Sequence, residues 1–144
     1  MAPFAERLAS AQKIADGRKI IATDIEKQLG TIFTADTMAA LKKRFPGQKF
    51  VWLMGADNLT QLPKWDRWLK IAHTMPILVL PRPKETRRAL AGHAAARLKR
   101  YRLPARSGVC LAQARPPAWI LLPVKENSSS ATALRRRQAK MKFW

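Results

Sequence analysis

The stretch from Phe50 to Leu59 constrains the fold of this chain more than any other segment. It reads F-V-W-L-M-G-A-D-N-L, an apolar run of strand length that stops at Gly55 and continues directly into Asp57 and Asn58. In a parallel sheet, polar side chains that follow a strand reach the ligand crevice at the carboxyl ends of the strands. The pattern therefore predicts a buried parallel strand leading into a binding site, with the layout of a nucleotide site.

Length and charge limit the size of the protein and the kind of partner. The 144 residues are 47% apolar, which is enough for one domain with a hydrophobic core. Lys and Arg total 28 against 9 acidic residues, a net charge of +19. Such a charge favours anionic partners, whether nucleotides, nucleic acid or an acidic membrane surface, and does not choose among them.

Cysteine content and the N-terminal sequence bear on location. The single Cys110 excludes an intramolecular disulfide framework and a multi-cysteine zinc cluster, which fits a reducing compartment. Glu6 and Arg7 stand where a signal peptide would need an apolar core, and the longest apolar runs are shorter than a bilayer requires. We expect a cytoplasmic protein with no membrane partner.

Helical and strand-like patterns alternate along the chain. Helices are predicted over residues 4–15, 34–44, 63–72 and 85–101, and a last one opens at 128–130. Strands are predicted over residues 19–23, 49–54, 76–80 and 118–122, and a loop over 102–117. Strands that alternate with helices predict an α/β fold with a parallel sheet flanked by helices.

Two helices carry specific expectations. Thr34 is expected to cap the helix that runs to Arg44. Trp65, Trp68 and Ala72 recur at helical spacing, so both tryptophans can be core residues of one amphipathic helix.

Three motifs, taken together, resemble the bacterial nicotinate-nucleotide adenylyltransferases. The first is Phe33-Thr34-Ala35-Asp36-Thr37, and the second is the G-x-D segment at Gly55 followed by Trp65 and Trp68. The third, Ser130-Ala131-Thr132-Ala133-Leu134-Arg135, matches the family signature S-S-T-x-I-R with two departures. The resemblance extends from Phe4 to Arg135 and implies a Rossmann-like fold.

The family's H-x-G-H motif is absent from the sequence. The only histidines are His73 and His93, neither with a second histidine three residues away, and neither is assigned a catalytic role. The resemblance implies that the first strand, its glycine loop and the H-x-G-H helix are missing. We therefore expect residues 1–144 to form a single, incomplete nucleotidyltransferase domain that is truncated at its N-terminus and inactive, with a basic tail at 136–144.

The resemblance assigns a role to five side chains. Trp65 stacks on the pyridine ring, Asp57 bonds a ribose hydroxyl of adenosine, and Thr34 helps to read the nicotinate carboxylate. Thr132 and Arg135 hold phosphates, where a helix N-terminus and a guanidinium fork suit an anion. Each of these roles has a structural alternative. Asp57 and Thr34 are also residues that commonly cap helices, and the segment at 130–135 can be an ordinary capped surface helix.

Further residues are weaker candidates. Gly55 and Ser130 belong to the motifs themselves, and Arg7 and Arg82 could reach phosphates. An arginine beside Pro83 or on a basic helix is more often solvated surface.

The implied reaction transfers the adenylyl group of ATP to nicotinate mononucleotide, giving nicotinate adenine dinucleotide and pyrophosphate. Mg²⁺ would accompany ATP, and no metal-binding residue is assigned in the chain. A basic nucleic-acid-binding or ribosome-associated protein is the alternative, supported by the net charge and the arginine-rich tail. The aromatic residues lie on apolar stripes rather than among the basic residues, so nucleic acid is not the expected partner. A catalytically dead remnant is the third possibility.

Overall fold

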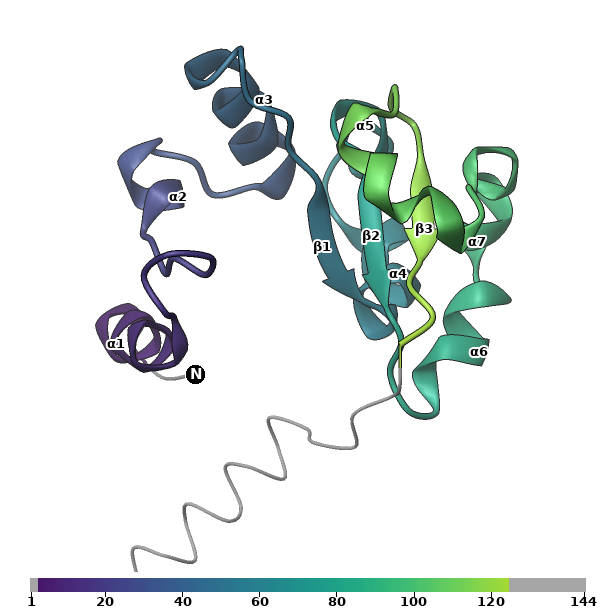
Figure 1. Cartoon of the computed structure of the whole chain (residues 1–144), viewed down its shortest axis with the longest axis horizontal. Coiled ribbons are helices and arrows are strands. Elements are labelled where there is room, and N and C mark those ends of the chain that lie inside the picture. The colour runs from purple at the N-terminus through teal and green to yellow at the C-terminus, as the bar shows by residue number, and fades with distance from the viewer. Residues whose placement is uncertain (1–2, 125–144) are drawn as a thin grey trace, which may run out of the picture. The chain divides into compact units, whose positions relative to one another are not determined.

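A computed structural model describes residues 3–124 of the chain (Figure 1). Contacts between Cα atoms divide the chain into two compact units, Met1–Pro46 and Gly47–Trp144, and each is described by itself. Across residues 3–124, no helix combines the length and the apolar character needed to cross a membrane.

The first unit is helical where the structure describes it. Its helices are α1 (Phe4–Ile14), α2 (Ile25–Gln28) and α3 (Thr34–Arg44). The predicted helices over 4–15 and 34–44 are confirmed. Helix α3 buries Ala35, Thr37 and Met38. Its last turn is basic, which complements the negative end of the helix dipole.

The predicted strand over residues 19–23 is wrong. Ile20 and Ile21 are 61% and 68% exposed. The Asp16 carboxylate accepts hydrogen bonds from the backbone N–H groups of residues 18–20, at 2.9, 2.8 and 2.8 Å. A strand would offer such N–H groups to its neighbour, so the local carboxylate competes with pairing in a sheet.

The second unit is built on a parallel sheet, as predicted. Its strands are β1 (Trp52–Gly55), β2 (Ile77–Leu80) and β3 (Trp119–Leu121), in the order β1-β2-β3. They lie within or beside the predicted strands over 49–54, 76–80 and 118–122. Because the strands are parallel, their carboxyl ends meet at one edge of the sheet.

Helices cover both faces of this sheet (Figure 1). Helix α4 (Ala56–Gln61) packs against β1 and β2 on one face, and the 3₁₀ helix η3 (Ala105–Gln113) packs against β3 on the other. On the η3 face, Leu111 and Ile120 are buried and Leu78 packs against them. Each fully buried Leu or Ile stabilises the fold by about 1.5–3 kcal/mol relative to exposure. Helices on both faces of a parallel sheet confirm the Rossmann-like α/β class.

The predicted helix over 63–72 is correct only in its second half. The 3₁₀ helix η1 (Leu62–Lys64) comes first, Trp65 follows it, and α5 (Trp68–Thr74) begins three residues after Trp65. Arg67 has a left-handed φ of 47°, so the chain turns immediately before α5. Trp65 and Trp68 therefore do not share one helix face, and Trp68 is half-buried rather than part of the core.

The predicted helix over 85–101 is divided into three pieces. They are α6 (Glu85–Leu90), α7 (His93–Arg97) and the 3₁₀ helix η2 (Lys99–Tyr101). The break falls at Gly92, whose backbone is extended where it caps α7. The two α-helices bury Ala89 and Ala94 separately.

The loop predicted over 102–117 is wrong for residues 105–113, which form η3. Side chains of a 3₁₀ helix repeat every three residues, a period that matches neither the α-helical nor the strand pattern. The burial of Leu111 explains why this segment is ordered against the sheet.

Candidate functional site

The site begins at the tight junction between β1 and α4. Gly55 is both the last residue of β1 and the N-cap of α4, with an extended backbone (φ −79°, ψ 160°). Asp57 lies in the first turn of α4, and Asn58 follows it. The apolar strand thus ends where the sequence predicted, and its polar residues come at the carboxyl edge of the sheet.

The neighbouring strand β2 brings an arginine to the same edge. Arg82 follows β2 by two residues, and its Nε lies 3.0 Å from Asp57 Oδ1. Both side chains are partly exposed, at 49% for Arg82 and 36% for Asp57. Arg82 is therefore not simply a solvated surface residue, because it forms an ion pair between the ends of two adjacent strands.

The Asp57 carboxylate has acceptor capacity left. Oδ1 itself is buried, and within residues 3–124 no donor meets hydrogen-bond geometry toward it, even though Arg82 Nε is close. Arg82 therefore neutralises this oxygen by its charge rather than by an aligned hydrogen bond. The exposed part of the Asp57 carboxylate can accept a hydrogen bond from a ligand hydroxyl at the end of the strand.

Glycine at position 55 leaves room for the ion pair, which lies directly against its backbone. A Cβ atom at Gly55 would overlap Asp57 Oδ1 and would lie only 2.7 Å from Arg82 Nε. No side chain fits there without displacing the pair. The same close approach lets a ligand reach the backbone at the strand end.

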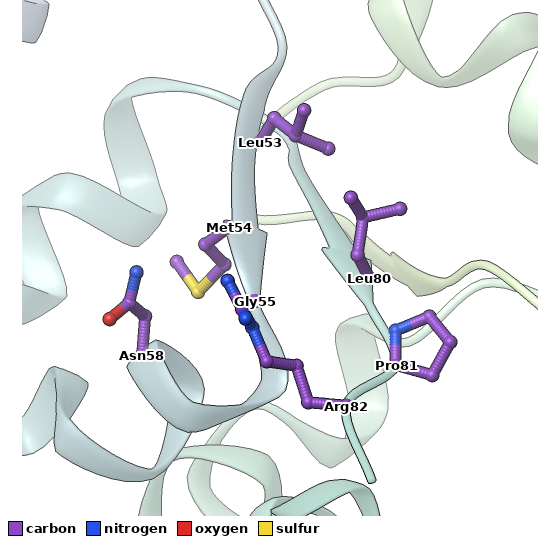
Figure 2. Close-up of a pocket in the computed structure, with 7 residues that line it drawn as sticks. All are labelled: Leu53, Met54, Gly55, Asn58, Leu80, Pro81 and Arg82. Atoms are coloured by element: carbon purple, nitrogen blue, oxygen red, sulfur yellow. The ribbon is translucent and has the colours of Figure 1, made fainter. Parts of the chain in front are cut away.

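A pocket of about 430 Å³ opens at this edge (Figure 2). Figure 2 shows the Arg82 side chain extending from the end of β2 toward Gly55, with Met54 and Asn58 on one side of β1. The lining of the pocket combines apolar groups with a cation, an amide and a glycine: Leu53, Met54, Gly55, Asn58, Leu80, Pro81 and Arg82. This volume lies within the range of small-molecule sites, roughly 300–1,000 Å³.

Trp65 does not line this pocket. Its ring lies against that of Trp52 in β1, with centroids 5.5 Å apart and planes at 54°. Trp68 contacts a different ring, that of His93, at 5.9 Å. Both Trp65 and Trp68 are half-buried. The contact with the pyridine ring that the resemblance implies for Trp65 remains a prediction.

Two predicted site residues belong to the first unit. Thr34 is the first residue of α3, whose N-cap is Phe33 with no side-chain hydrogen bond, so the predicted Thr34 cap is wrong. The turn is held instead by Thr37, whose hydroxyl donates to the Phe33 carbonyl at 3.2 Å. Arg7 lies on α1, where its guanidinium is 5.6 Å from the centre of the Phe4 ring.

The predicted phosphate-binding segment lies outside the described residues. Ser130, Thr132 and Arg135, the helix expected to open at 128–130, and the basic tail at 136–144 all fall beyond residue 124. Their roles remain predictions.

The described acidic and histidine residues do not form a metal cage. Within residues 3–124, no group of three or more His, Cys, Asp or Glu side chains is placed to hold an ion. His73 and His93 are exposed, and His73 faces the Tyr101 ring at 6.4 Å. Asp57, which contacts the pocket-lining Arg82 without lining the pocket itself, is already beside a guanidinium.

Asn58 and the Asp57–Arg82 pair are the features of the site that sequence reasoning did not assign. The sequence marks Asn58 only as a polar residue after the strand, and Arg82 only as a weak candidate for a phosphate contact. The signal available for the pair is that both residues follow consecutive parallel strands, whose carboxyl ends lie side by side.

The fold and the strand-end pocket define an α/β protein of the nucleotide-binding kind. A search with family models finds no match. Curated relatives identify the family. The chain is 54% identical over 135 residues to the probable nicotinate-nucleotide adenylyltransferase of Gluconobacter oxydans, covering 94% of this chain and 69% of that protein. The chain belongs to the nicotinate-nucleotide adenylyltransferase family.

Further relatives agree. The probable nicotinate-nucleotide adenylyltransferases of Gluconacetobacter diazotrophicus and Parvibaculum lavamentivorans are each 50% identical over 94% and 95% of this chain. The chain spans 63% and 68% of their lengths. A solved structure, Plasmodium falciparum nicotinic acid mononucleotide adenylyltransferase complexed with APC, has a TM-score of 0.57 over 92% of this chain and 57% of that one. At 18% identity, it supports the fold alone.

Proposed function

We propose that this protein acts in the transfer of the adenylyl group of ATP to nicotinate mononucleotide, and that the pocket at the ends of β1 and β2 holds a nucleotide. The observation that carries the proposal is the 54% identity to a family member over nearly the whole chain. The pocket supports it, because a carboxylate with spare acceptor capacity and a guanidinium meet over a glycine.

The proposed reaction is a direct phosphoryl displacement. An oxygen of the mononucleotide phosphate attacks the α-phosphorus of ATP, and the bond from that phosphorus to the bridging β-phosphate oxygen breaks. Nicotinate adenine dinucleotide forms, and pyrophosphate leaves. Catalysis of this kind depends on positioning the two phosphates in line and on stabilising their charge, and no covalent enzyme intermediate is needed.

The described residues divide the binding between them. Asp57, whose side chain is partly exposed, accepts a hydrogen bond from a ribose hydroxyl through its carboxylate. Arg82, which uses Nε toward Asp57, keeps its terminal nitrogens for phosphate oxygens. Gly55 allows both side chains to lie against the strand end.

Mg²⁺ enters the proposal only as the ion that accompanies ATP. The described residues do not fit a metal held by the protein, because Asp57, the carboxylate beside the pocket-lining Arg82, is paired with that arginine. Phosphate oxygens and water are the usual ligands of Mg²⁺ in such complexes. Thr132 and Arg135 remain the proposed phosphate contacts beyond the described residues. The single, exposed Cys110 accords with a proposed cytoplasmic location.

Calorimetric titration of the purified chain with ATP and with nicotinate mononucleotide tests the proposal. Saturable binding of both nucleotides is expected, with ATP binding weakened in Asp57→Asn. RNA binding that fades with salt, without saturable nucleotide binding, would instead support the nucleic-acid alternative.

A further inference from the structure

We propose that Trp52 is a positioning residue, which holds the indole of Trp65 in the orientation that receives a flat heterocycle. The inference rests on the proposed function, because it deepens the role that the resemblance gives to Trp65. The motif that assigns Trp65 gives Trp52 no role beyond its place in an apolar strand.

The two indoles are in direct contact although 13 positions separate them in the sequence. Their ring centroids lie 5.5 Å apart and their planes meet at 54°, which falls within the favourable range for tilted aromatic pairs. Both residues are half-buried, so each ring combines a packed part with an exposed part.

The two partners differ in how firmly the backbone holds them. Trp52 opens β1, where its N–H donates to the Pro76 carbonyl at 2.9 Å and its Cα lies opposite Ile77. Trp65 lies outside regular structure, between η1 and α5, and its N–H closes a turn onto the Leu62 carbonyl at 3.0 Å. The backbone therefore holds Trp52, on a strand, more firmly than Trp65, on a turn. In this pair, Trp52 restricts the side chain of Trp65.

The tilted geometry explains how Trp52 can hold the ring without covering it. Planes that meet at 54° do not stack flat, so Trp52 does not occupy a face of Trp65 in the way a parallel ring would. The half-buried Trp65 keeps exposed surface for a ligand ring. Restricting its rotamers before binding removes part of the entropy loss on binding, which raises affinity without a new contact to the ligand.

Substitution of Trp52 separates this role from ordinary packing. Trp52→Leu keeps an apolar side chain and removes the ring, and Trp52→Phe restores a ring. Trp68→Leu is the matched control, because Trp68 is also half-buried but contacts His93 instead of Trp65. Trp65→Leu identifies the spectroscopic signal of the pair.

Two measurements on the full chain decide the outcome. The exciton couplet of the paired indoles in circular dichroism is expected to disappear in Trp52→Leu and in Trp65→Leu and to persist in Trp68→Leu. Affinity for nicotinate mononucleotide is expected to fall about 2- to 10-fold in Trp52→Leu, with recovery in Trp52→Phe and with ATP affinity unchanged.

Several results would overturn the inference. If the couplet persists in Trp52→Leu, it does not arise from the pair of Trp52 and Trp65. If the mononucleotide affinity of Trp52→Leu is unchanged, Trp52 has no positioning role. Equal losses for both nucleotides would reduce Trp52 to a packing residue. If Trp52→Leu does not fold, Trp52→Met serves as the ringless variant. A selective loss of mononucleotide affinity in Trp52→Met supports the inference, and wild-type affinity overturns it.

Failure of the proposed function gives a different result. The unaltered chain would then bind no mononucleotide while its couplet still responded to Trp52→Leu, which would refute the ligand role of Trp65 and leave the ring contact established.

Discussion

Arg82 Nε lies 3.0 Å from Asp57 Oδ1, and the two side chains meet over Gly55, where no Cβ atom can be accommodated. The three residues come from the ends of two adjacent parallel strands, so the sheet itself brings them together. This relationship links the G-x-D motif to a position 25 residues later in the sequence, and it makes separate predictions for stability and for binding.

Gly55→Ala is expected to impair ATP binding more than folding. The atoms that a new Cβ meets are the ends of two side chains, which can rotate away, so the loss of folding stability is expected to be about 1 kcal/mol, at the low end for overpacking. Rotation separates Asp57 from Arg82 and spoils the site. Thermal unfolding and calorimetric titration measure the two effects. Gly108→Ala is the control, because nothing lies within 4 Å of a Cβ there. A variant that binds ATP as well as wild type would contradict the role of the glycine.

Asp57→Asn is expected to leave stability almost unchanged and to weaken ATP binding. A partly exposed ion pair contributes only about 0.2–1 kcal/mol to folding. A hydrogen bond from a ligand hydroxyl to a charged acceptor contributes about 1.5–3 kcal/mol, or roughly 10- to 100-fold in affinity.

The matched control for Asp57→Asn is Asp66→Asn. Asp66 also pairs with an arginine, Arg67, at 2.6 Å, but Arg67 does not line the pocket, whereas Arg82, the partner of Asp57, does. Equal ATP affinities in Asp57→Asn and Asp66→Asn would show that the Asp57 carboxylate has no ligand role.

Acid is expected to loosen the turn after α1. Hydrogen bonds from backbone N–H groups lower the pKa of Asp16 below its usual 3.8; the bond from Ile20 has the largest effect, and that from Arg18 the next largest. Because the pKa is lower in the folded state, the ionised carboxylate stabilises the turn at pH values above 3.8. This stabilisation is lost as the pH falls through the folded-state pKa. Amide chemical shifts of residues 18–20, followed by NMR during acid titration, should therefore change below the usual pKa. Asp16→Ala should show the loosened shifts at neutral pH, and unchanged shifts in that variant would refute the assignment.

Trp65→Ala is expected to weaken binding of nicotinate mononucleotide far more than binding of ATP. Loss of one aromatic stacking surface corresponds to about 1–3 kcal/mol, by analogy with bases stacked on aromatic side chains. Titration with each nucleotide separately makes the comparison. Parallel losses for both would indicate that the substitution disturbs folding instead.

The sequence predicted the sheet better than it predicted the helices. Apolar runs such as the one ending at Gly55 located the parallel strands, although β1 itself is only partly buried, with Leu53 56% exposed. Helical periodicity located α3, whereas the cap predicted at Thr34 is wrong because Phe33 is the N-cap. The apolar pattern at residues 19–23 predicts a strand that does not form, because Asp16 accepts hydrogen bonds from the N–H groups that a strand would use.

Tertiary contacts account for what the sequence could not show. The contact of Trp52 with Trp65 depends on how the turn after η1 returns toward β1. The hydrophobic periodicity of the sequence does not predict the path of that turn. The break at Gly92 was missed because a glycine inside a helical pattern is often tolerated. By contrast, the meeting of Asp57 and Arg82 follows from parallel strand order, and could have been inferred from the sequence.

Calorimetric titration of the purified chain with ATP tests the central claim most directly, namely that the strand-end pocket is a nucleotide site of this family. Saturable binding of ATP is predicted, reduced roughly 10- to 100-fold by Asp57→Asn and unaffected by Asp66→Asn. Absence of ATP binding, or ATP binding that Asp57→Asn leaves unchanged, would contradict the account.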